Sequence, residues 1–374
     1  MCVLGKGGGR AVIICKRKEK IERNGVEKME TNGALCHDIL TEKMQPSLAF
    51  NARNNYIKWK KAVREKFIEV LGLDVIAGNV CEPNLTVEEE LEKDGYKQIK
   101  FSFYSEVGEV VVCYLLIPNL GKEKYPVVIT LQGHTTGFHI SLGEKKYEGD
   151  EEFLPRGAMA LQAVKQGYVA LAIEQRGMGV RAAENEAFRR THLGERAGCY
   201  YTAMTASLLG RTVIGERCWD IKRAIDMLSN FSQCDLDKIA ITGNSGGGTA
   251  SYYASCYDER IKICMPSSAF CPFKESILRF YHCSCNYIPG AYKYFDMQDL
   301  ACLIAPRKMT ITTGQLDPSF LVEGVRRGYE TVEKIYKKEK CADNCKLIIT
   351  QQGHYWNVDL MWTEMKRVMQ ELGW

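Results

Sequence analysis

The residues best suited to carry chemistry lie in one short stretch, 243–247, which reads Gly-Asn-Ser-Gly-Gly. A run of β-forming residues, 239–242, leads into it, and a helix-like stretch, 249–256, follows. This order predicts a strand, a sharp turn and a helix, with Ser245 at the apex. The glycines suit such a turn, because the serine backbone is strained there and larger neighbours would collide with the strand and the helix. We therefore predict that Ser245 is a nucleophile; the alternative is a plain glycine-rich turn.

A nucleophilic serine needs a base to take its proton and an acid to orient that base. Of the six histidines in the chain, two follow Ser245, namely His282 and His354. His354 comes directly after the last predicted strand and before the last predicted helix, so we assign it as the base. His282 lies in an irregular segment, 266–296, and we expect it to have a structural or substrate-contacting role.

The acid is expected after the penultimate strand, where residues 313–318 read Thr-Gly-Gln-Leu-Asp-Pro. This position favours Asp317 as the orienting acid. The alternative is that Asp317 only forms an Asp-Pro turn or caps the following helix. Asp296 and Asp299 are weaker candidates for the same role.

An oxyanion formed by attack on a carbonyl needs two backbone N–H donors. Gly246, the residue after the nucleophile, supplies one at the start of a helix, where the helix dipole also favours negative charge. We expect the second from the loop after the third predicted strand, at His134, with Thr135 as the next choice.

The elements around these residues alternate between strand and helix. We expect the first two predicted strands to form an antiparallel hairpin. The later predicted strands are continuous apolar runs, which are typical of parallel strands buried on both faces. The strands are predicted at 97–105, 109–118, 126–131, 169–173, 238–242, 261–265, 308–312 and 346–350. A hairpin that leads into a mostly parallel, doubly wound sheet with helices on both faces matches the eight-stranded plan of the α/β-hydrolases.

The sequence predicts one catalytic domain with an extension before it. Residues 1–45 are expected to be poorly ordered, and residues 46–94 to form a helical segment. The α/β-hydrolase domain follows at 95–374. Two insert segments within it, 174–210 and 266–296, are expected to flank the pocket.

The composition limits the possible partners. The net charge is +4 with acids and bases interspersed, which argues against an electrostatic nucleic-acid binder. No stretch approaches the ~20 apolar residues of a membrane helix, so no membrane partner is expected. We expect the substrate to be a small-molecule ester. The composition is compatible with a monomer and with a homo-oligomer.

The chain has 16 cysteines, many of them inside apolar segments, which fits a reducing cytoplasm. Cys283-x-Cys285 and Cys341-x3-Cys345 have the residue types of metal ligands. Neither has a second pair at zinc-site spacing, so we favour a core or surface role and expect no metal and no organic cofactor.

The motifs together resemble the acetyl xylan esterase and dienelactone hydrolase-like branch of the α/β-hydrolases, from about residue 95 onwards. They comprise Gln-Gly-His at 132–134, Glu-Gln-Arg-Gly-Met-Gly at 174–179, Gly-Arg at 210–211, Gly-Asn-Ser-Gly-Gly-Gly at 243–248, the Gly-x-x-Asp and His that follow, and the segment 282–307. In this branch an Arg-Gly turn ties the active-site loops together, which implies that role for Arg176. His282 and Tyr287 are implied as substrate-binding or structural residues. His134 departs from the pattern, because deacetylases of the branch have an aromatic residue there.

The resulting hypothesis is a serine carboxylester hydrolase that removes acetyl groups from small acylated carbohydrates. A hydrolase of another acyl class, such as a lactone, peptide or aminoacyl substrate, is the alternative. A third, more remote hypothesis is a binding protein built on an inactive hydrolase scaffold.

Overall fold

The computed structural model of the chain describes residues 34–182 and 197–374. The chain divides into two units, 1–43 and 44–374. The first unit contains a helix, α1 (Leu35–Lys43). Most of the extension predicted to be poorly ordered lies outside the described residues. Within it, residues 35–43 are helical, because leucine, glutamate and lysine favour helix.

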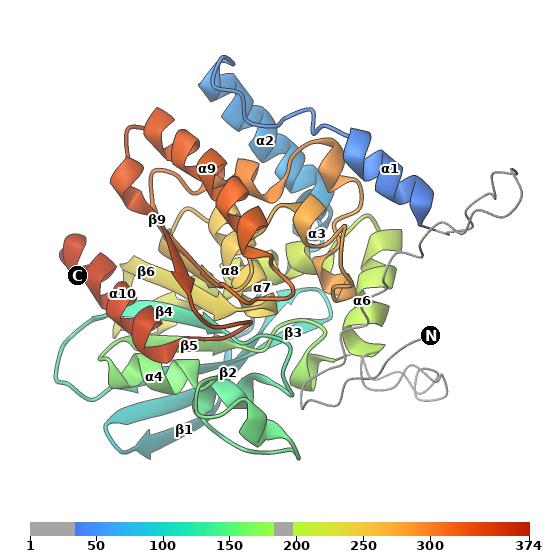
Figure 1. Cartoon of the computed structure of the whole chain (residues 1–374). Helices are drawn as coiled ribbons and strands as arrows, with labels where there is room; N and C mark the ends of the chain where they lie inside the picture. The colour runs from blue at the N-terminus through green and yellow to red at the C-terminus, as the bar shows by residue number, and fades with distance from the viewer. Residues whose placement is uncertain (1–33, 183–196) are drawn as a thin grey trace, which may run out of the picture. The chain divides into compact units, whose positions relative to one another are not determined.

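The second unit is built on one nine-stranded sheet with the strand order β1-β2-β3-β5-β4-β6-β7-β8-β9 (Figure 1). The first three strands and the β3–β5 pair are antiparallel, and all the remaining pairs are parallel. The strands are β1 (Thr86–Lys93), β2 (Tyr96–Glu106), β3 (Glu109–Pro118), β4 (Tyr125–Leu131), β5 (Val169–Ile173), β6 (Cys234–Asn244), β7 (Ile261–Ser267), β8 (Lys308–Gly314) and β9 (Cys345–Thr350). The prediction of a mostly parallel sheet entered by a hairpin is confirmed.

The strand count differs from the eight that were expected, because β1 lies in the segment predicted to be helical. This strand reads Thr-Val-Glu-Glu-Glu-Leu-Glu-Lys, and seven of its eight residues are exposed. A charged, exposed strand lacks the apolar alternation by which strands are recognised. It is a strand because it pairs with β2 over its length, from Thr86 opposite Ser102 to Lys93 opposite Tyr96.

Helices cover both faces of the sheet and enclose two cores (Figure 1). Side chains of α4 and α10 pack on one face, and those of α2, α3, α7, α8 and α9 pack on the other. These helices are α2 (Tyr56–Leu71), α3 (Leu73–Ala77), α4 (Met159–Lys165), α7 (Val213–Met227), α8 (Gly246–Tyr257), α9 (Val322–Lys338) and α10 (Val358–Glu371). A further helix, α6, spans Ala197–Leu208. Short 3-10 helices occur at intervals along the segment 273–303. In the part of the chain that the structure describes, we find no helix of the length and apolarity needed to span a bilayer.

The first turn of α8 is pressed against the central strand β4. A Cβ atom added to Gly247 would lie 2.0 Å from the carbonyl oxygen of Leu131 and 2.5 Å from that of Gln132. A Cβ on Gly243 would meet the same backbone, 2.6 Å from the Leu131 oxygen. Glycine is therefore required on both sides of Ser245 for the helix to approach the sheet this closely.

A buried carboxylate ties together the loops that follow β4 and β5. Oε1 of Glu174 accepts a hydrogen bond from Nε2 of Gln132 at 2.8 Å, and Oε2 accepts from the backbone N–H groups of Phe138 and Val180. The adjacent Gln175 donates through its side chain to the carbonyl oxygen of Gln132 at 2.7 Å. Burial raises the pKa of Glu174 to about 7, although the hydrogen bonds that it accepts lower it.

Replacing Gly247 by alanine should destabilise the protein by about 3 kcal/mol or prevent folding, because the new methyl group overlaps the backbone of β4. The matched control is Gly78→Ala, where the nearest atom lies 3.4 Å from the added Cβ and φ is −70°. Urea unfolding should show a much lower free energy of unfolding for Gly247→Ala. The free energy of unfolding of Gly78→Ala should be close to that of the wild type. Equal stability of the two variants would contradict the close approach of α8 to β4.

The raised pKa of Glu174 predicts a pH dependence of stability. A carboxyl group with a higher pKa in the folded state binds its proton more tightly there, so stability falls as pH rises from about 4.5 to 7. Glu174→Gln cannot lose a proton and so avoids this fall in stability. The melting temperature of the variant minus that of the wild type should therefore become more positive from about pH 5 to about pH 8. The exposed Glu151 provides the control, since Glu151→Gln should follow the wild-type curve. Parallel curves for Glu174→Gln and wild type would refute the prediction.

Candidate functional site

Ser245 occupies the turn between β6 and α8 with φ 56° and ψ −123°. A positive φ is rare for a residue with a side chain and costs on the order of 1–3 kcal/mol. The backbone N–H of Ser245 donates to the carbonyl oxygen of Ser267 at 2.9 Å, which fixes the turn against β7. The predicted strand, turn and helix are thus present, and the serine is held in a strained conformation at the apex.

Asp317 and His354 form a hydrogen-bonded pair, with Oδ2 of the aspartate 2.9 Å from Nδ1 of the histidine. Asp317 is 3% exposed, and its Oδ1 accepts from the backbone N–H groups of Ser319 and Phe320. Burial opposes the negative charge, but the hydrogen bond from His354 and its charge, with the backbone donors, keep the pKa of Asp317 below its ordinary value. The carboxylate can therefore fix the imidazole and stabilise its protonated form.

The loops that carry this pair are packed backbone to backbone. The N–H of Gln315 donates to the carbonyl oxygen of Thr350, and that of Leu316 to Gln352. A Cβ on Gly314 would lie 2.1 Å from the carbonyl oxygen of Gly353. Ser245, Asp317 and His354 follow the carboxyl ends of β6, β8 and β9, which belong to the parallel part of one sheet. Within the described residues, the Ser245 hydroxyl forms no hydrogen bond to His354, a contact that often tightens only when substrate binds.

The loop after β4 lies directly over the turn of Ser245. A Cβ on Gly133 would come within 3.2 Å of the Ser245 Cβ, and a Cβ on Gly246 within 2.8 Å of the His134 ring. Among the residues that the structure describes, the backbone N–H groups of His134 and Gly246 have no acceptor. Thr135 differs, because its N–H donates to the carbonyl oxygen of Gly133.

His282 is buried near the pair, and its ring, like that of His354, contacts the ring of Phe320. The ring of Phe320 lies 6.0 Å from that of His354, stacked, and 5.3 Å from that of His282. Burial, together with the nearby His354, lowers the pKa of His282. Its Nε2 has no hydrogen-bond partner among the described residues, so His282 does not replace His354 as the partner of Asp317.

The two other candidate acids cap a short helix. Asp296 accepts from the backbone N–H groups of Phe273 and Met297, and Asp299 accepts from those of Asp296 and Phe50. Asp296 and Asp299 also form a capping box at the start of the 3-10 helix Met297–Leu303, in which the side chain of each accepts from the backbone N–H of the other. Both carboxylates are thus occupied by backbone N–H groups, and neither is paired with His354.

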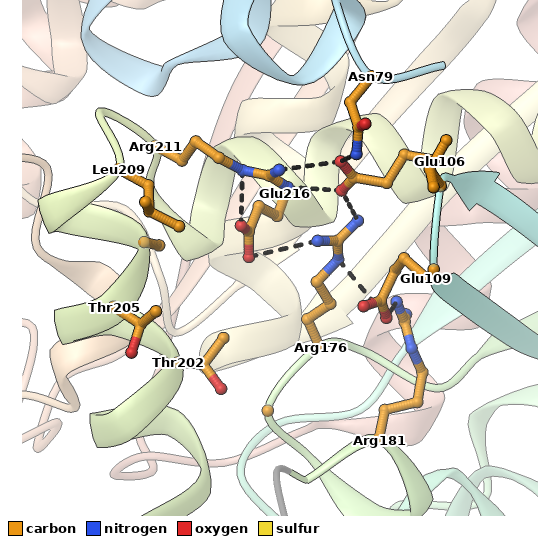
Figure 2. Close-up of a pocket in the computed structure, with 14 residues that line it drawn as sticks. Asn79, Glu106, Glu109, Arg176, Arg181, Thr202, Thr205, Leu209, Arg211 and Glu216 are labelled. Atoms are coloured by element: carbon orange, nitrogen blue, oxygen red, sulfur yellow. Dashed lines mark hydrogen bonds and ion pairs between the residues drawn. The ribbon is translucent and has the colours of Figure 1, made fainter. Parts of the chain in front are cut away.

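Arg176 is the centre of a buried ionic network that joins β2, the loop after β5 and α7 (Figure 2). It forms two hydrogen bonds to Asp220, each 2.9 Å long, and one of 2.7 Å to Glu106. Neighbouring carboxylates raise its pKa well above the ordinary value, although burial alone would lower it. A hollow of about 350 Å³ adjoins the network, and neither Ser245 nor His354 lines it. Arg176 therefore links the loop after β5 to the end of β2 and to α7.

Four aromatic residues of segment 266–296 form two groups by their exposure. Phe270 and Phe273 are buried in the core, whereas Tyr281 is 88% exposed and Tyr287 is 43% exposed. The hydroxyl of Tyr287 donates to the carbonyl oxygen of Ile277 at 3.3 Å. Of these residues, only the tyrosines present surface to a ligand.

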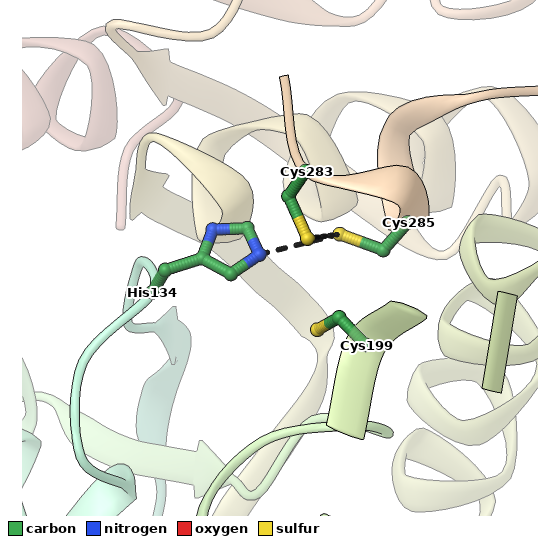
Figure 3. Close-up of side chains that lie close together, drawn as sticks. All are labelled: His134, Cys199, Cys283 and Cys285. Atoms are coloured by element: carbon green, nitrogen blue, oxygen red, sulfur yellow. Dashed lines mark hydrogen bonds between the residues drawn. The ribbon is translucent and has the colours of Figure 1, made fainter. Parts of the chain in front are cut away.

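One cluster of side chains does not follow from any pattern in the sequence. The side chains of His134, Cys199, Cys283 and Cys285 converge, and their ligand atoms all lie within 4.8 Å of one another (Figure 3). Cys283-x-Cys285 was the partial signal in the sequence. The other two residues come from positions 134 and 199, so no local spacing joins them to it.

Comparison with solved structures shows the same fold in several esterases. A protein of Bacteroides fragilis NCTC 9343 named as an acetyl xylan esterase is similar with a TM-score of 0.76 and 18% identity, over 91% of this chain and 95% of that one. A glucuronoyl esterase from Solibacter usitatus is similar with a TM-score of 0.59 and 13% identity, over 87% of this chain and 97% of that one. At these identities the likeness demonstrates the fold.

Comparison of sequences gives the family. YtaP of Bacillus subtilis (strain 168), which is named as a hydrolase, is 24% identical over 256 residues, or 66% of this chain and 79% of that protein. The model described as the Abhydrolase family matches residues 19–348, which is most of the chain. The predicted fold and hydrolase class are confirmed at this level, and the chain belongs to the Abhydrolase family.

Proposed function

We propose that the protein is a serine carboxylester hydrolase that acts through Ser245, His354 and Asp317. One combination of observations carries the proposal: a serine in a strained turn at the start of α8, and an Asp317–His354 hydrogen bond of 2.9 Å at the ends of neighbouring parallel strands. Both features suit an activated serine: the turn exposes the hydroxyl group, and the hydrogen-bonded acid orients the base. The order serine, acid, base along the chain is the order found in this fold.

In the proposed reaction, Oγ of Ser245 attacks the ester carbonyl while Nε2 of His354 accepts its proton. Asp317 accepts the hydrogen bond from Nδ1–H and stabilises the imidazolium. The N–H groups of Gly246 and His134 donate to the oxyanion of the tetrahedral intermediate. His354 then protonates the leaving alcohol. Water, activated by the same base, hydrolyses the acyl-enzyme and restores the serine.

For the substrate, we propose acetyl esters of small carbohydrates. The structurally similar proteins are named for acetyl xylan and glucuronoyl esters, both of which are esters of sugars. The exposed Tyr281 and Tyr287 offer rings on which a sugar can stack. Turnover of acetylated xylo-oligosaccharides and acetylated monosaccharides should therefore exceed that of aminoacyl esters and lactones. Faster turnover of a lactone or an aminoacyl substrate would move the protein to another acyl class.

Replacing Ser245 by alanine should lower kcat on p-nitrophenyl acetate by at least about 10³-fold, since the nucleophile is lost. A fluorophosphonate probe should label the wild type and leave this variant unlabelled. Ser255→Ala is the matched control, because Ser255 is a buried serine of the same helix whose hydroxyl bonds to the Ser251 carbonyl oxygen. A folded wild type that neither hydrolyses short esters nor reacts with the probe would indicate a binding protein.

The two histidines near Asp317 should respond differently to substitution. His354→Ala should lower kcat by about 10³-fold or more, because it removes the base. His282→Ala should retain activity within about tenfold of wild type, since His282 makes no hydrogen bond to the acid. Steady-state kinetics on p-nitrophenyl acetate, with circular dichroism to verify folding, would measure both effects. The reverse pattern would show that the base has been misassigned.

A further inference from the structure

The cluster of His134, Cys199, Cys283 and Cys285 has the composition of a tetrahedral metal site. The Sγ atom of Cys285 lies 3.3 Å from Nε2 of His134 and 3.4 Å from Sγ of Cys283. All three cysteines are free thiols. With Zn–S distances of about 2.3 Å, the ligand atoms of a tetrahedral site lie about 3.5–3.8 Å apart. The cluster therefore needs only small side-chain adjustments to enclose one ion.

The ligands come from three segments that are distant in the sequence (Figure 3). His134 lies in the loop after β4, Cys199 lies in the first turn of α6, and the Cys283-x-Cys285 pair lies at the start of a 3-10 helix in segment 266–296. These segments are the proposed oxyanion loop and the two inserts that were expected to flank the pocket. An ion bound here would cross-link them.

The charge around the cluster supports thiolate ligands. Arg217 is 1% exposed, and its guanidinium group lies 3.4 Å from Sγ of Cys285 and 3.5 Å from Sγ of Cys199. Its other hydrogen bonds go to the carbonyl oxygen of Arg176, and among the described residues no carboxylate pairs with it. A buried guanidinium group needs a negative partner. Three thiolates and one Zn²⁺ ion leave a single negative charge, which Arg217 neutralises.

The two ring nitrogens of His134 face different surroundings. Nε2 faces the sulfur atoms, whereas Nδ1 lies 2.9 Å from the position that a Cβ on Gly246 would occupy. The imidazole thus fills the space between the cluster and the first residue of α8. A fixed ring would hold the backbone of His134 in place beside Ser245.

We infer that these four residues bind one Zn²⁺ ion in a closed Cys₃His site. With four protein ligands the site has no open position, so its role is to position the oxyanion loop and not to activate water. On binding, the three thiols release their protons to solvent and the neutral imidazole donates a lone pair. This inference replaces the expectation from sequence spacing that the chain has no metal site. The binding of zinc is independent of the proposed function, whereas the effect on turnover rests on it.

Metal analysis of the purified full-length chain tests the site directly. Inductively coupled plasma mass spectrometry should find about one zinc per chain. Cys283→Ser and Cys285→Ser should lose most of it, while Cys341→Ser and Cys345→Ser, from the other closely spaced cysteine pair, should retain it. A wild type without zinc, or control variants that lose it equally, would overturn the inference.

A second measurement does not depend on whether the variants fold. Wild type in which zinc has been exchanged for Co²⁺ should show the absorption bands of tetrahedral cobalt and a thiolate-to-cobalt charge-transfer band, and added Zn²⁺ should abolish them. Octahedral cobalt without the charge-transfer band would overturn the site. So would a mass two hydrogens lower under non-reducing conditions, with a disulfide mapped between two of the three cysteines.

Turnover then tests the positioning role. Removal of zinc with a chelator should lower kcat on p-nitrophenyl acetate more than it raises KM, and added Zn²⁺ should restore kcat. Unchanged kcat in the zinc-free, folded enzyme would leave the site intact but refute its link to the oxyanion loop. A zinc-loaded wild type with no esterase activity would refute the proposed function alone.

Discussion

The close approach of α8 to β4 is the constraint on which the candidate site depends. Because Gly247 has no side chain, the helix begins directly over the carbonyl oxygens of Leu131 and Gln132. The turn before the helix must then be so tight that Ser245 adopts a positive φ. The strained conformation of Ser245 is stabilised by the hydrogen bond from its backbone N–H to the carbonyl oxygen of Ser267 in the sheet. The neighbouring glycines allow the close packing around it. The same short distance brings the loop after β4 to the serine.

The surrounding loops are joined by buried polar groups, which add to the apolar packing of residues such as Phe138 and Met178. Glu174 and Gln175 hold the loop after β4 through Gln132, and Arg176, the next residue, holds α7 and the end of β2. Its carbonyl oxygen in turn accepts from Arg217, which contacts the cysteine cluster. Three consecutive residues after one strand therefore connect the loop after β4, the ionic network and the inferred metal site.

The sequence sufficed for the features that local patterns encode. The turn of Ser245, the hairpin and the parallel strands follow from glycine spacing and apolar runs, and the pairing of Asp317 with His354 follows from their places after successive strands. Two features could not be predicted. The charged strand β1 exists through pairing with β2, and the ligands of the cysteine cluster meet only after the chain has folded. Both depend on contacts between distant segments, which a local pattern does not record.

The exposed strand β1 has a consequence for how molecules of this protein approach one another. It forms one edge of the sheet, and its free backbone groups are those to which another strand would bond. Four of its eight residues are glutamates, at positions 88, 89, 90 and 92, and only two of them are paired with lysines of β2. Two such edges brought together would place the glutamates of one strand close to those of the other. Electrostatic repulsion thus protects the open border of the sheet from joining that of a second molecule.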